Sequence, residues 1–246
     1  MPRNAREKSQ SGIYHIMLRG IDKRDIFLTK TDYKKFLKYL ELAKNKSDFL
    51  ILAFCLMANH VHLLLKEGNE EVGDSVRRIA VGYAQYHNHN HGRTGHLFQN
   101  RYLSEPVNDD NYLLVVSRYI HQNPLKAGLV NHIEDYEWSS YRNYLLKDRA
   151  LTDTDFLNKY FSNEESFIKF NKQKNNDQCL EYKVVNRYTD DELQEVISNI
   201  VDFNDLSGID LQARNLALRK IKGETGASIR QLERVIGIGR NIIQKA

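Results

Sequence analysis

The fold of this chain is decided by residues 49–66, FLILAFCLMANHVHLLLK. The segment Phe49–Cys55 predicts a strand, and because Leu50–Leu56 is apolar nearly throughout, this strand is expected at the centre of a sheet. A turn is expected at residues 57–59, and His60–Lys66 predicts a second strand that runs antiparallel to the first. The sequence therefore predicts an antiparallel strand pair around which the neighbouring elements assemble.

The neighbouring segments extend this pair to a domain of seven elements. The other predicted elements are a strand over 13–19, a helix over 31–46, a helix over 72–90, a strand over 96–107 and a helix over 109–122. Proline has a fixed φ and no N–H, so Pro124 is expected to end the last helix. The order β-α-β-β-α-β-α predicts an α+β fold with a ferredoxin-like antiparallel sheet, helices on one face and the other face free for a ligand.

Length and charge indicate a second, smaller domain. A chain of 246 residues can form one full core and an additional unit. From Leu211 onward, eight basic side chains stand against two acidic ones, whereas the whole chain has a net charge of only +4. We predict a sheet-containing domain over 1–145, a helical extension and linker over 146–187, and an all-helical domain over 188–246.

Composition excludes three classes of protein. Cys55 and Cys179 lie far apart and form no Cys-x-x-Cys pair, so neither a zinc ribbon nor a disulfide framework is expected. The longest apolar runs are far shorter than the roughly 18–20 residues that span a bilayer. The polar start lacks the apolar stretch of a signal peptide. We therefore expect a soluble, cytoplasmic protein with no membrane partner.

A histidine pair lies in the second strand of the central pair. Side chains alternate across a strand, so His60 and His62 emerge on one face while Val61 points to the other. Two neutral imidazoles side by side can hold a metal ion. Such a pair is more often incidental, so a third ligand is needed to decide between these two interpretations.

One of the 14 tyrosines stands at a spacing that suits chemistry beside this pair. Tyr119 and Asn123 are four residues apart on the predicted helix and therefore share a face, whereas His121 lies on another face and is expected at the surface. An amide oxygen can ligate a hard cation, and a tyrosine can attack a phosphate to form a covalent phosphodiester. Packing of Tyr119 in the core, with Asn123 as a cap, stays open as the alternative. The competing tyrosines are Tyr83, Tyr86, Tyr102 and Tyr112.

Four motifs together carry a resemblance to a known family. They are residues 14–20 (YHIMLRG), 57–64 (MANHVHLL), 92–102 (GRTGHLFQNRY) and 119–124 (YIHQNP). In this order and at this spacing, over about residues 10–145, the chain resembles the IS200-like superfamily of HUH tyrosine transposases. Within it, the chain is most similar to the REP-associated branch, named for repetitive extragenic palindromes.

The resemblance implies a metal-dependent enzyme that nicks and rejoins single-stranded hairpin DNA. By the family pattern, His60 and His62 hold Mg²⁺ or Mn²⁺ and Asn123 is the third ligand. Tyr119 then attacks a phosphate, which leaves a 5′-phosphotyrosine link and a free 3′-hydroxyl. The resemblance is compatible with a monomer or a homodimer.

Basic and amide side chains other than the expected nucleophile and metal ligands predict contacts with DNA. Arg93, Gln99 and Arg101 lie in the loop and strand that the family shares, where they can bind phosphates and base edges of a hairpin. Residues 1–46 hold twelve basic and five acidic side chains, which is enough for a surface that binds the DNA backbone in a salt-dependent way.

The C-terminal residues 226–240 resemble a helix-turn-helix of the kind found in bacterial replication initiators. A glycine turn separates two amphipathic segments, and Arg230 and Arg240 are placed to contact duplex DNA. The second segment has only seven residues before the chain ends at Ala246. We therefore expect duplex DNA as a second partner if this short helix-turn-helix is complete.

Two alternatives of other classes stay open. A ferredoxin-like sheet with exposed aromatic side chains also suits a non-catalytic nucleic-acid-binding module with an RNA-recognition-like sheet, which predicts binding without a metal and without a covalent product. A metal site at which water attacks predicts a plain nuclease that leaves free 5′-phosphate ends. The covalent product therefore distinguishes the three functions.

Overall fold

The computed structural model describes residues 6–181, 188–201 and 210–246. Contacts within the chain divide it into two compact units, Met1–Glu181 and Tyr182–Ala246. None of the described helices is long and apolar enough to cross a membrane.

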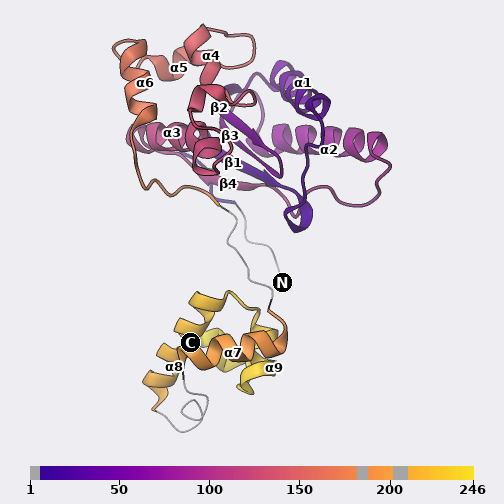
Figure 1. The fold of residues 1–246 in the computed structure, drawn as a ribbon, viewed down its shortest axis with the longest axis vertical. Coiled ribbons are helices and arrows are strands. Elements are labelled where there is room, and N and C mark those ends of the chain that lie inside the picture. Colours follow the sequence, from indigo (N-terminus) through magenta and orange to yellow (C-terminus); the bar gives the residue numbers. More distant parts are fainter. Residues whose placement is uncertain (1–5, 182–187, 202–209) are drawn as a thin grey trace. The chain divides into compact units, whose positions relative to one another are not determined.

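The first unit is built on a four-stranded antiparallel sheet (Figure 1). Its strands are β1 (Ile13–Arg19), β2 (Leu50–Met57), β3 (His60–Lys66) and β4 (Leu103–Pro106), in the spatial order β2-β3-β1-β4. The predicted hairpin is formed by β2 and β3, while β1 pairs antiparallel with both β3 and β4. The α+β class and the ferredoxin-like sheet predicted from sequence are confirmed. Only β4 is shorter than expected.

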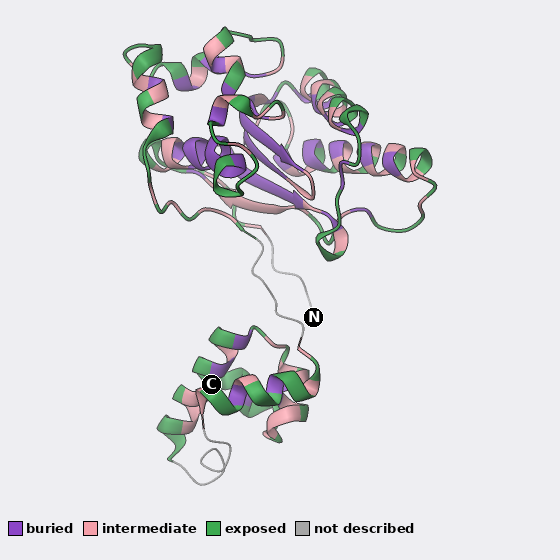
Figure 2. Cartoon of the chain, viewed as in Figure 1, coloured by how far each residue is buried: buried purple, intermediate pink, exposed green. Residues whose placement is uncertain are grey.

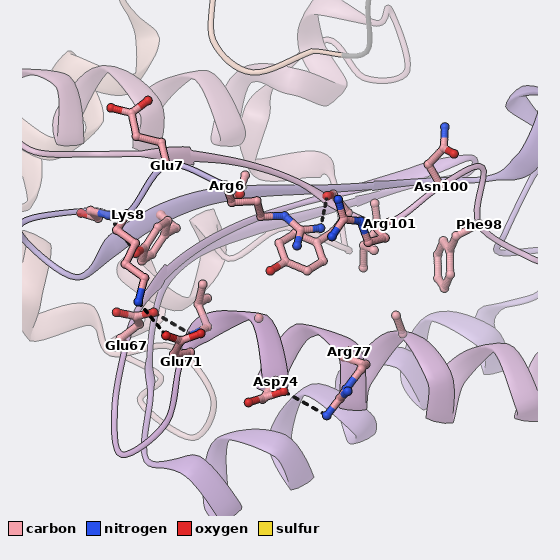
Figure 3. Close-up of a pocket in the computed structure, with 18 of the residues that line it drawn as sticks. Arg6, Glu7, Lys8, Glu67, Glu71, Asp74, Arg77, Phe98, Asn100 and Arg101 are labelled. Atoms are coloured by element: carbon pink, nitrogen blue, oxygen red, sulfur yellow. Dashed lines mark hydrogen bonds and ion pairs between the residues drawn. The ribbon is translucent and has the colours of Figure 1, made fainter. Parts of the chain in front are cut away.

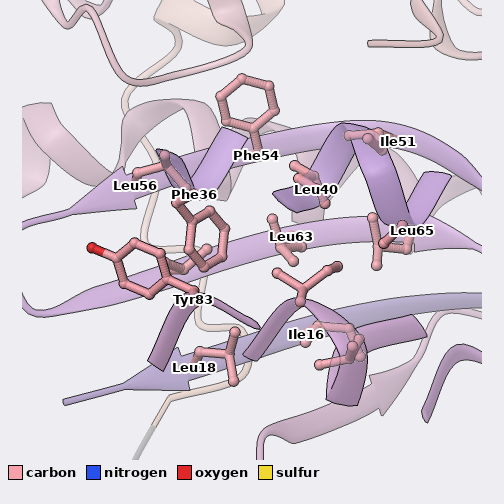
Figure 4. Close-up of a cluster of buried hydrophobic side chains, with 14 of the residues drawn as sticks. Ile16, Leu18, Phe36, Leu40, Ile51, Phe54, Leu56, Leu63, Leu65 and Tyr83 are labelled. Atoms are coloured by element: carbon pink, nitrogen blue, oxygen red, sulfur yellow. The ribbon is translucent and has the colours of Figure 1, made fainter. Parts of the chain in front are cut away.

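Two long helices cover one face of this sheet. They are α1 (Lys30–Ser47) and α2 (Val72–Asn90), and a capping box of Thr29 and Asp32 begins α1. Apolar side chains from both helices meet those of the strands in a fully buried core (Figures 2 and 4). Members of this core include Ile16, Leu18, Phe36, Leu40, Leu63 and Tyr83.

The opposite face of the sheet carries α3 (Asp110–Lys126), so it is not open along its whole length. Val116 and Ile120 of this helix join a second core with Leu52 and Leu64. The predicted end of α3 at Pro124 is wrong. Pro124 lies in the last turn, where the helix loses a single backbone hydrogen bond and continues to Lys126.

Three short helices complete the first unit. They are α4 (Tyr141–Leu146), α5 (Thr154–Asn158) and α6 (Glu164–Lys172), and two 3₁₀ turns span Ile21–Lys23 and Ile133–Asp135. Aromatic side chains of α4 and α6 pack beside α3 in the second core. The described part of the predicted 146–187 segment thus belongs to the first unit, and residues 182–187 lie outside the described residues.

The expectation that His121 lies at the surface is wrong. His121 is fully buried on α3, with Nδ1 2.9 Å from Oδ1 of Asn171 and Nε2 3.1 Å from Oγ of Ser140. The side of α3 that carries His121 is covered by α6 and by the segment before α4, both distant in sequence. A local helical pattern contains no signal for such a cover.

The described part of the second unit is helical. It contains α7 (Asp190–Ile200), α8 (Leu211–Thr225), α9 (Ile229–Ile236) and α10 (Arg240–Lys245). Leu193, Leu218, Leu232 and Ile243 form its core. Gly237 caps α9 with a φ of 75°, a left-handed conformation that favours glycine. The short helix, tight turn and short helix predicted at the C-terminus are present.

Candidate active site

The two histidines of β3 face the side of the sheet that carries α3. Val61 and Leu63 belong to the core under α1 and α2, so the alternating His60 and His62 point the other way. Their ring centroids are 5.1 Å apart and the rings are nearly perpendicular. Burial lowers the pKa of both imidazoles. Both rings are therefore neutral near pH 7, and each keeps a nitrogen lone pair.

Tyr119 and Asn123 of α3 lie against these histidines. The Tyr119 ring is 5.6 Å from the His62 ring. Asn123, one helical turn further on, lies close enough to His60 and Tyr119 to influence the pKa of both side chains. The structure thus brings together the nucleophile and all three metal ligands expected from the sequence.

Two hydrogen bonds of Asn59 determine which ring nitrogen of His60 carries the proton. Asn59 Nδ2 donates to the Lys23 carbonyl at 3.1 Å, which leaves the Asn59 amide oxygen to face His60. That oxygen lies 2.6 Å from His60 Nδ1. An amide oxygen can only accept, so Nδ1 carries the proton. Nε2 of His60 is consequently the nitrogen with the free lone pair.

His62 has a buried nitrogen without a partner. Its ring is fully buried, yet Nε2 makes no hydrogen bond to any described residue. Buried polar atoms are almost always paired, and an orphan of this kind points to a ligand. Within the described ranges, no three His, Cys, Asp or Glu side chains are grouped to hold a metal. Asn123 stays the predicted third protein ligand of a metal bound by His60 and His62.

A distant segment reaches the Tyr119 hydroxyl. This hydroxyl donates a hydrogen bond to the carboxylate of Glu181, the last described residue of the first unit. Burial, together with this carboxylate, raises the pKa of Tyr119. The resting phenol is therefore protonated and already bonded to a group that can accept its proton.

Residues 171–181, which we term the covering segment, are held along one side of α3. Three α3 side chains spaced four residues apart bind it, in keeping with helical periodicity. The bonds run from Arg118 to Asp177, from Gln122 to the carbonyls of Asn171 and Gln173, and from Lys126 to Asn175. These contacts place Glu181 at Tyr119.

The four competing tyrosines are engaged elsewhere. Tyr83 donates to the Ile26 carbonyl, Tyr86 to Asp32 and Tyr112 to Glu105, while the Arg6 guanidinium lies 3.6 Å from the centre of the Tyr102 ring. Among the described tyrosines, only Tyr119 is in ring contact with His62. The geometry thus favours the tyrosine that the sequence favoured.

The residues of this site lie within a region that matches a known protein family. Residues 8–123 match the model of the transposase family described as IS200 like. The match includes the whole sheet, the histidine pair and α3 as far as Asn123. After this match, we term residues 8–123 the transposase domain. Over these residues, the chain is therefore similar to the DNA transposases of the IS200-like family.

Two relatives of the transposase domain are known in more detail. A Haemophilus influenzae protein assigned to the REP-associated tyrosine transposases is 25% identical over 149 residues, which cover 55% of this chain and 83% of that protein. A solved structure of a REP-associated tyrosine transposase bound to a REP hairpin has a TM-score of 0.51 at 20% identity, over 63% of this chain and 90% of that chain. The transposase domain thus shares its fold with a tyrosine transposase.

The structure separates the three residues predicted to bind DNA in the transposase domain. Arg101 lines a cavity of about 640 Å³ beside α2, together with Phe98 and Tyr102 (Figure 3). Exposed Gln99 does not line this cavity. Its main-chain N–H donates to the carbonyl of Arg19.

Arg19 lies opposite His60 in the register of β1 and β3, so Gln99 is at the same end of the sheet as the histidine pair. Arg93 is half-buried in the loop between α2 and β4 and does not line the cavity. These two residues and Arg101 therefore do not form one compact patch.

In the second unit, Arg230 and Arg240 are both exposed. Arg240 forms an ion pair with Glu233 of α9. This ion pair links α10 to α9 across the glycine turn, so Arg240 has a structural role whether or not it meets DNA.

Sequence reasoning missed three residues beside the transposase site. His15 of β1 contacts His62, Glu105 of β4 lies beside His15, and Glu181 contacts Tyr119. His15 belongs to the YHIMLRG motif, but its proximity follows only from the adjacency of β1 and β3. Nothing in the local sequence marks Glu181.

Proposed function

We propose that this chain is a metal-dependent tyrosine transposase that nicks and rejoins single-stranded hairpin DNA through a 5′-phosphotyrosine intermediate. The observation that carries this proposal is the contact of Tyr119 with buried His62, whose Nε2 has no hydrogen-bond partner among the described residues. A module that only binds nucleic acid has no need for this combination.

His60 Nε2, His62 Nε2 and the amide oxygen of Asn123 would hold the divalent cation, Mg²⁺ or Mn²⁺. A cation bound there would polarise the scissile phosphate and neutralise charge that develops on its oxygens. The remaining coordination positions are left for phosphate oxygens and water, since these hard cations prefer oxygen ligands.

Tyr119 supplies the nucleophile. Its oxygen forms a bond to the scissile phosphorus while the bond from that phosphorus to the 3′-oxygen breaks. The departing 3′-oxygen takes a proton from water, so the product is a 5′-phosphotyrosine and a free 3′-hydroxyl. The phosphodiester conserves the bond energy, so attack by a 3′-hydroxyl on the phosphotyrosine rejoins the strand without an external energy source. Both histidines and Tyr119 come from one chain, so this chemistry requires no residue from a second copy.

Glu181 accepts the proton of Tyr119 as the new bond forms. Replacement of Glu181 by glutamine keeps a hydrogen-bonding side chain of the same size but removes the base, so we expect adduct formation to slow by about 100-fold. The measurement is the single-turnover rate of adduct formation on a labelled hairpin at saturating protein. A faster rate in the glutamine variant would mean that the carboxylate obstructs Tyr119 instead of assisting it.

The DNA proposed for this site is a hairpin with a single-stranded flank. This proposal is supported by the fold shared with a transposase that was solved in complex with a REP hairpin. Phe98 and Tyr102 at the cavity offer aromatic faces for unpaired bases, and Arg101 offers a cation for a phosphate. Arg93 and Gln99 are proposed as separate contacts to the DNA, Gln99 nearer the histidines.

Removal of the Arg101 charge is expected to weaken hairpin binding and its salt dependence. In the Arg101→Ala variant, the slope of log K against log salt concentration should fall by about 1, the value for one lost phosphate contact. Fluorescence anisotropy over a salt series measures it. Arg149→Ala serves as the control because Arg149 is equally cationic but lies on the surface and does not line this cavity. Equal slopes in the two variants would remove Arg101 from the interface.

The second unit is proposed to bind duplex DNA near the hairpin through α9 and α10. Exposed Arg230 and Arg240 at this helix pair support the proposal. Because α10 is short and Arg240 is shared with Glu233, we propose contacts to the DNA backbone instead of sequence readout.

The proposed function is tested by incubating the full chain with a 5′- or 3′-labelled hairpin and Mn²⁺ or Mg²⁺. The expected result is a denaturant-resistant protein–DNA adduct, with the DNA linked through its 5′-phosphate to a peptide that contains Tyr119. Binding without an adduct would support the nucleic-acid-binding module. Cleavage that leaves free 5′-phosphate ends would support a nuclease that uses water.

A further inference from the structure

A third histidine lies directly behind the histidine pair. His15 is fully buried on β1, on the face of the sheet that it shares with His62. Its Nε2 is 2.9 Å from Nδ1 of His62, and the two ring centroids are 5.1 Å apart. The Tyr119 ring packs on both imidazoles, at 6.0 Å from His15 and 5.6 Å from His62. His15 therefore belongs to the same cluster but is absent from the expected ligand set.

Only one proton can lie between these two nitrogens. Both rings are fully buried and neither has a hydrogen bond to a described carboxylate, which favours the neutral form of each ring. If His15 Nε2 is the donor, His62 carries no proton on Nδ1 and must carry one on Nε2. That nitrogen could then not bind a metal. If His62 Nδ1 is the donor, Nε2 of His62 keeps its lone pair.

Glu105 decides between the two arrangements. It lies opposite His15 in the register of β1 and β4, with Oε2 4.0 Å from His15 Nδ1. The Tyr112 hydroxyl donates to the same carboxylate oxygen at 2.7 Å. His15 Nδ1 has no hydrogen bond to a described residue, so the carboxylate acts on it through its charge, which favours a proton on that nitrogen and repels a bare lone pair there. With its proton on Nδ1, His15 can only accept at Nε2.

We propose that His15, oriented by Glu105, is a positioning residue that holds His62 in the Nδ1–H tautomer and so presents the Nε2 lone pair of His62 to the metal. This inference rests on the proposed function, because it concerns a metal ligand of that site. The carboxylate of Glu105 on β4 thus acts through His15 on β1 to set the tautomer of His62 on β3. His60 reaches the equivalent state through Asn59.

The tautomer is measured directly by long-range ¹H–¹⁵N NMR of the histidine rings in the metal-free full chain near pH 7. The expected spectrum shows His62 protonated at Nδ1 and His15 also protonated at Nδ1, each assigned by the loss of its signals in a His62→Ala or His15→Gln protein. A spectrum with His62 protonated at Nε2 overturns the proposal. The spectrum of the metal-free protein does not depend on any catalytic activity.

Metal affinity provides the second measurement, with Mn²⁺ alone as the probe and free Mn²⁺ quantified by electron paramagnetic resonance. His15→Phe fills the space but cannot accept a hydrogen bond, so we expect Mn²⁺ to bind about 10- to 100-fold more weakly. His15→Gln places a side-chain oxygen near the former Nε2, so its affinity should stay within a few-fold of the parent. Unchanged affinity in both variants, or equal loss in both, contradicts the proposal.

Met17→Leu is the matched packing control. Met17 is buried on the same face of β1 and lies opposite His62 in the strand register, but it has no hydrogen bond to the ring. Its replacement should lower the thermal midpoint without changing Mn²⁺ affinity. If the parent protein itself binds no Mn²⁺ through His60 and His62, the proposed function fails. If the parent binds and His15→Phe binds equally well, only the role of His15 fails.

Discussion

The Tyr119→Phe variant is expected to form no covalent adduct with hairpin DNA, a loss on the order of 10³-fold or more in rate. The nucleophilic oxygen is the only atom removed, and no described tyrosine other than Tyr119 lies in ring contact with His62. The ring itself still packs against His15 and His62, so the cluster and the fold are expected to persist. The measurement is the yield of denaturant-resistant adduct at single turnover, with thermal unfolding as a check on the fold.

Tyr86→Phe is the control for this prediction. The Tyr86 hydroxyl bonds to Asp32, on the opposite side of the sheet from Tyr119. Its loss should leave the adduct yield unchanged within a few-fold. An adduct that persists in Tyr119→Phe but disappears in Tyr86→Phe would move the nucleophile to another tyrosine and overturn the assignment.

Hairpin affinity separates chemistry from binding in the same variant. Tyr119 is nearly buried, with 6% of its surface exposed, and is not among the residues that line the cavity beside α2. The phenylalanine variant should therefore bind hairpin DNA as tightly as the parent. Joint loss of binding and adduct would indicate that Tyr119 holds the DNA and does not attack it.

The core of the site was predictable because two short-range periodicities define it. The period of two places His60 and His62 on one face, and the period of 3.6 places Tyr119 and Asn123 on one side of α3. Both patterns depend only on the type of the local element. The resemblance to a transposase family then indicated that the two pairs meet, which local periodicity cannot do.

The residues that sequence reasoning missed depend on contacts between distant segments. His15 and His62 are 47 positions apart and meet only because β1 lies beside β3 in the sheet. Glu181 is 62 positions from Tyr119 and is brought there by the covering segment along α3. No period in the sequence encodes such a segment. The burial of His121 has the same kind of cause, because Asn171 of α6 and Ser140 before α4 contact its ring.

Pro124 illustrates a different limit. The rule that proline ends a helix concerns its interior, where the missing N–H and the ring clash cost about 3 kcal/mol or more. Near the C-terminus the cost is smaller because one further turn can close through other bonds, such as the Ala127 N–H to the Asn123 carbonyl. The observed helix therefore ends later than predicted, but Tyr119 and Asn123 lie on it as expected.

The His62→Ala variant is expected to lose metal-dependent adduct formation by about 10³-fold. His62 is the fully buried member of the histidine pair, and its Nε2 is the nitrogen without a partner. A Lewis acid at the scissile phosphate contributes several kcal/mol, and each 1.36 kcal/mol corresponds to a factor of ten in rate. The rate of adduct formation is measured over a series of Mn²⁺ concentrations. His60→Ala, which removes the half-buried ligand, should show the same direction of change.

The control for a lost buried imidazole is His87→Ala. His87 of α2 is as deeply buried as His62, and neither of its nitrogens has a partner among the described residues, but it packs against Tyr83 and His91 and not at the site. Both variants remove the same number of atoms from the interior, so both should be less stable. Only His62→Ala should lose the response to Mn²⁺ while still binding the hairpin. Full adduct formation by His62→Ala, or equal loss in His87→Ala, would show that the histidine pair supports the fold and holds no catalytic metal.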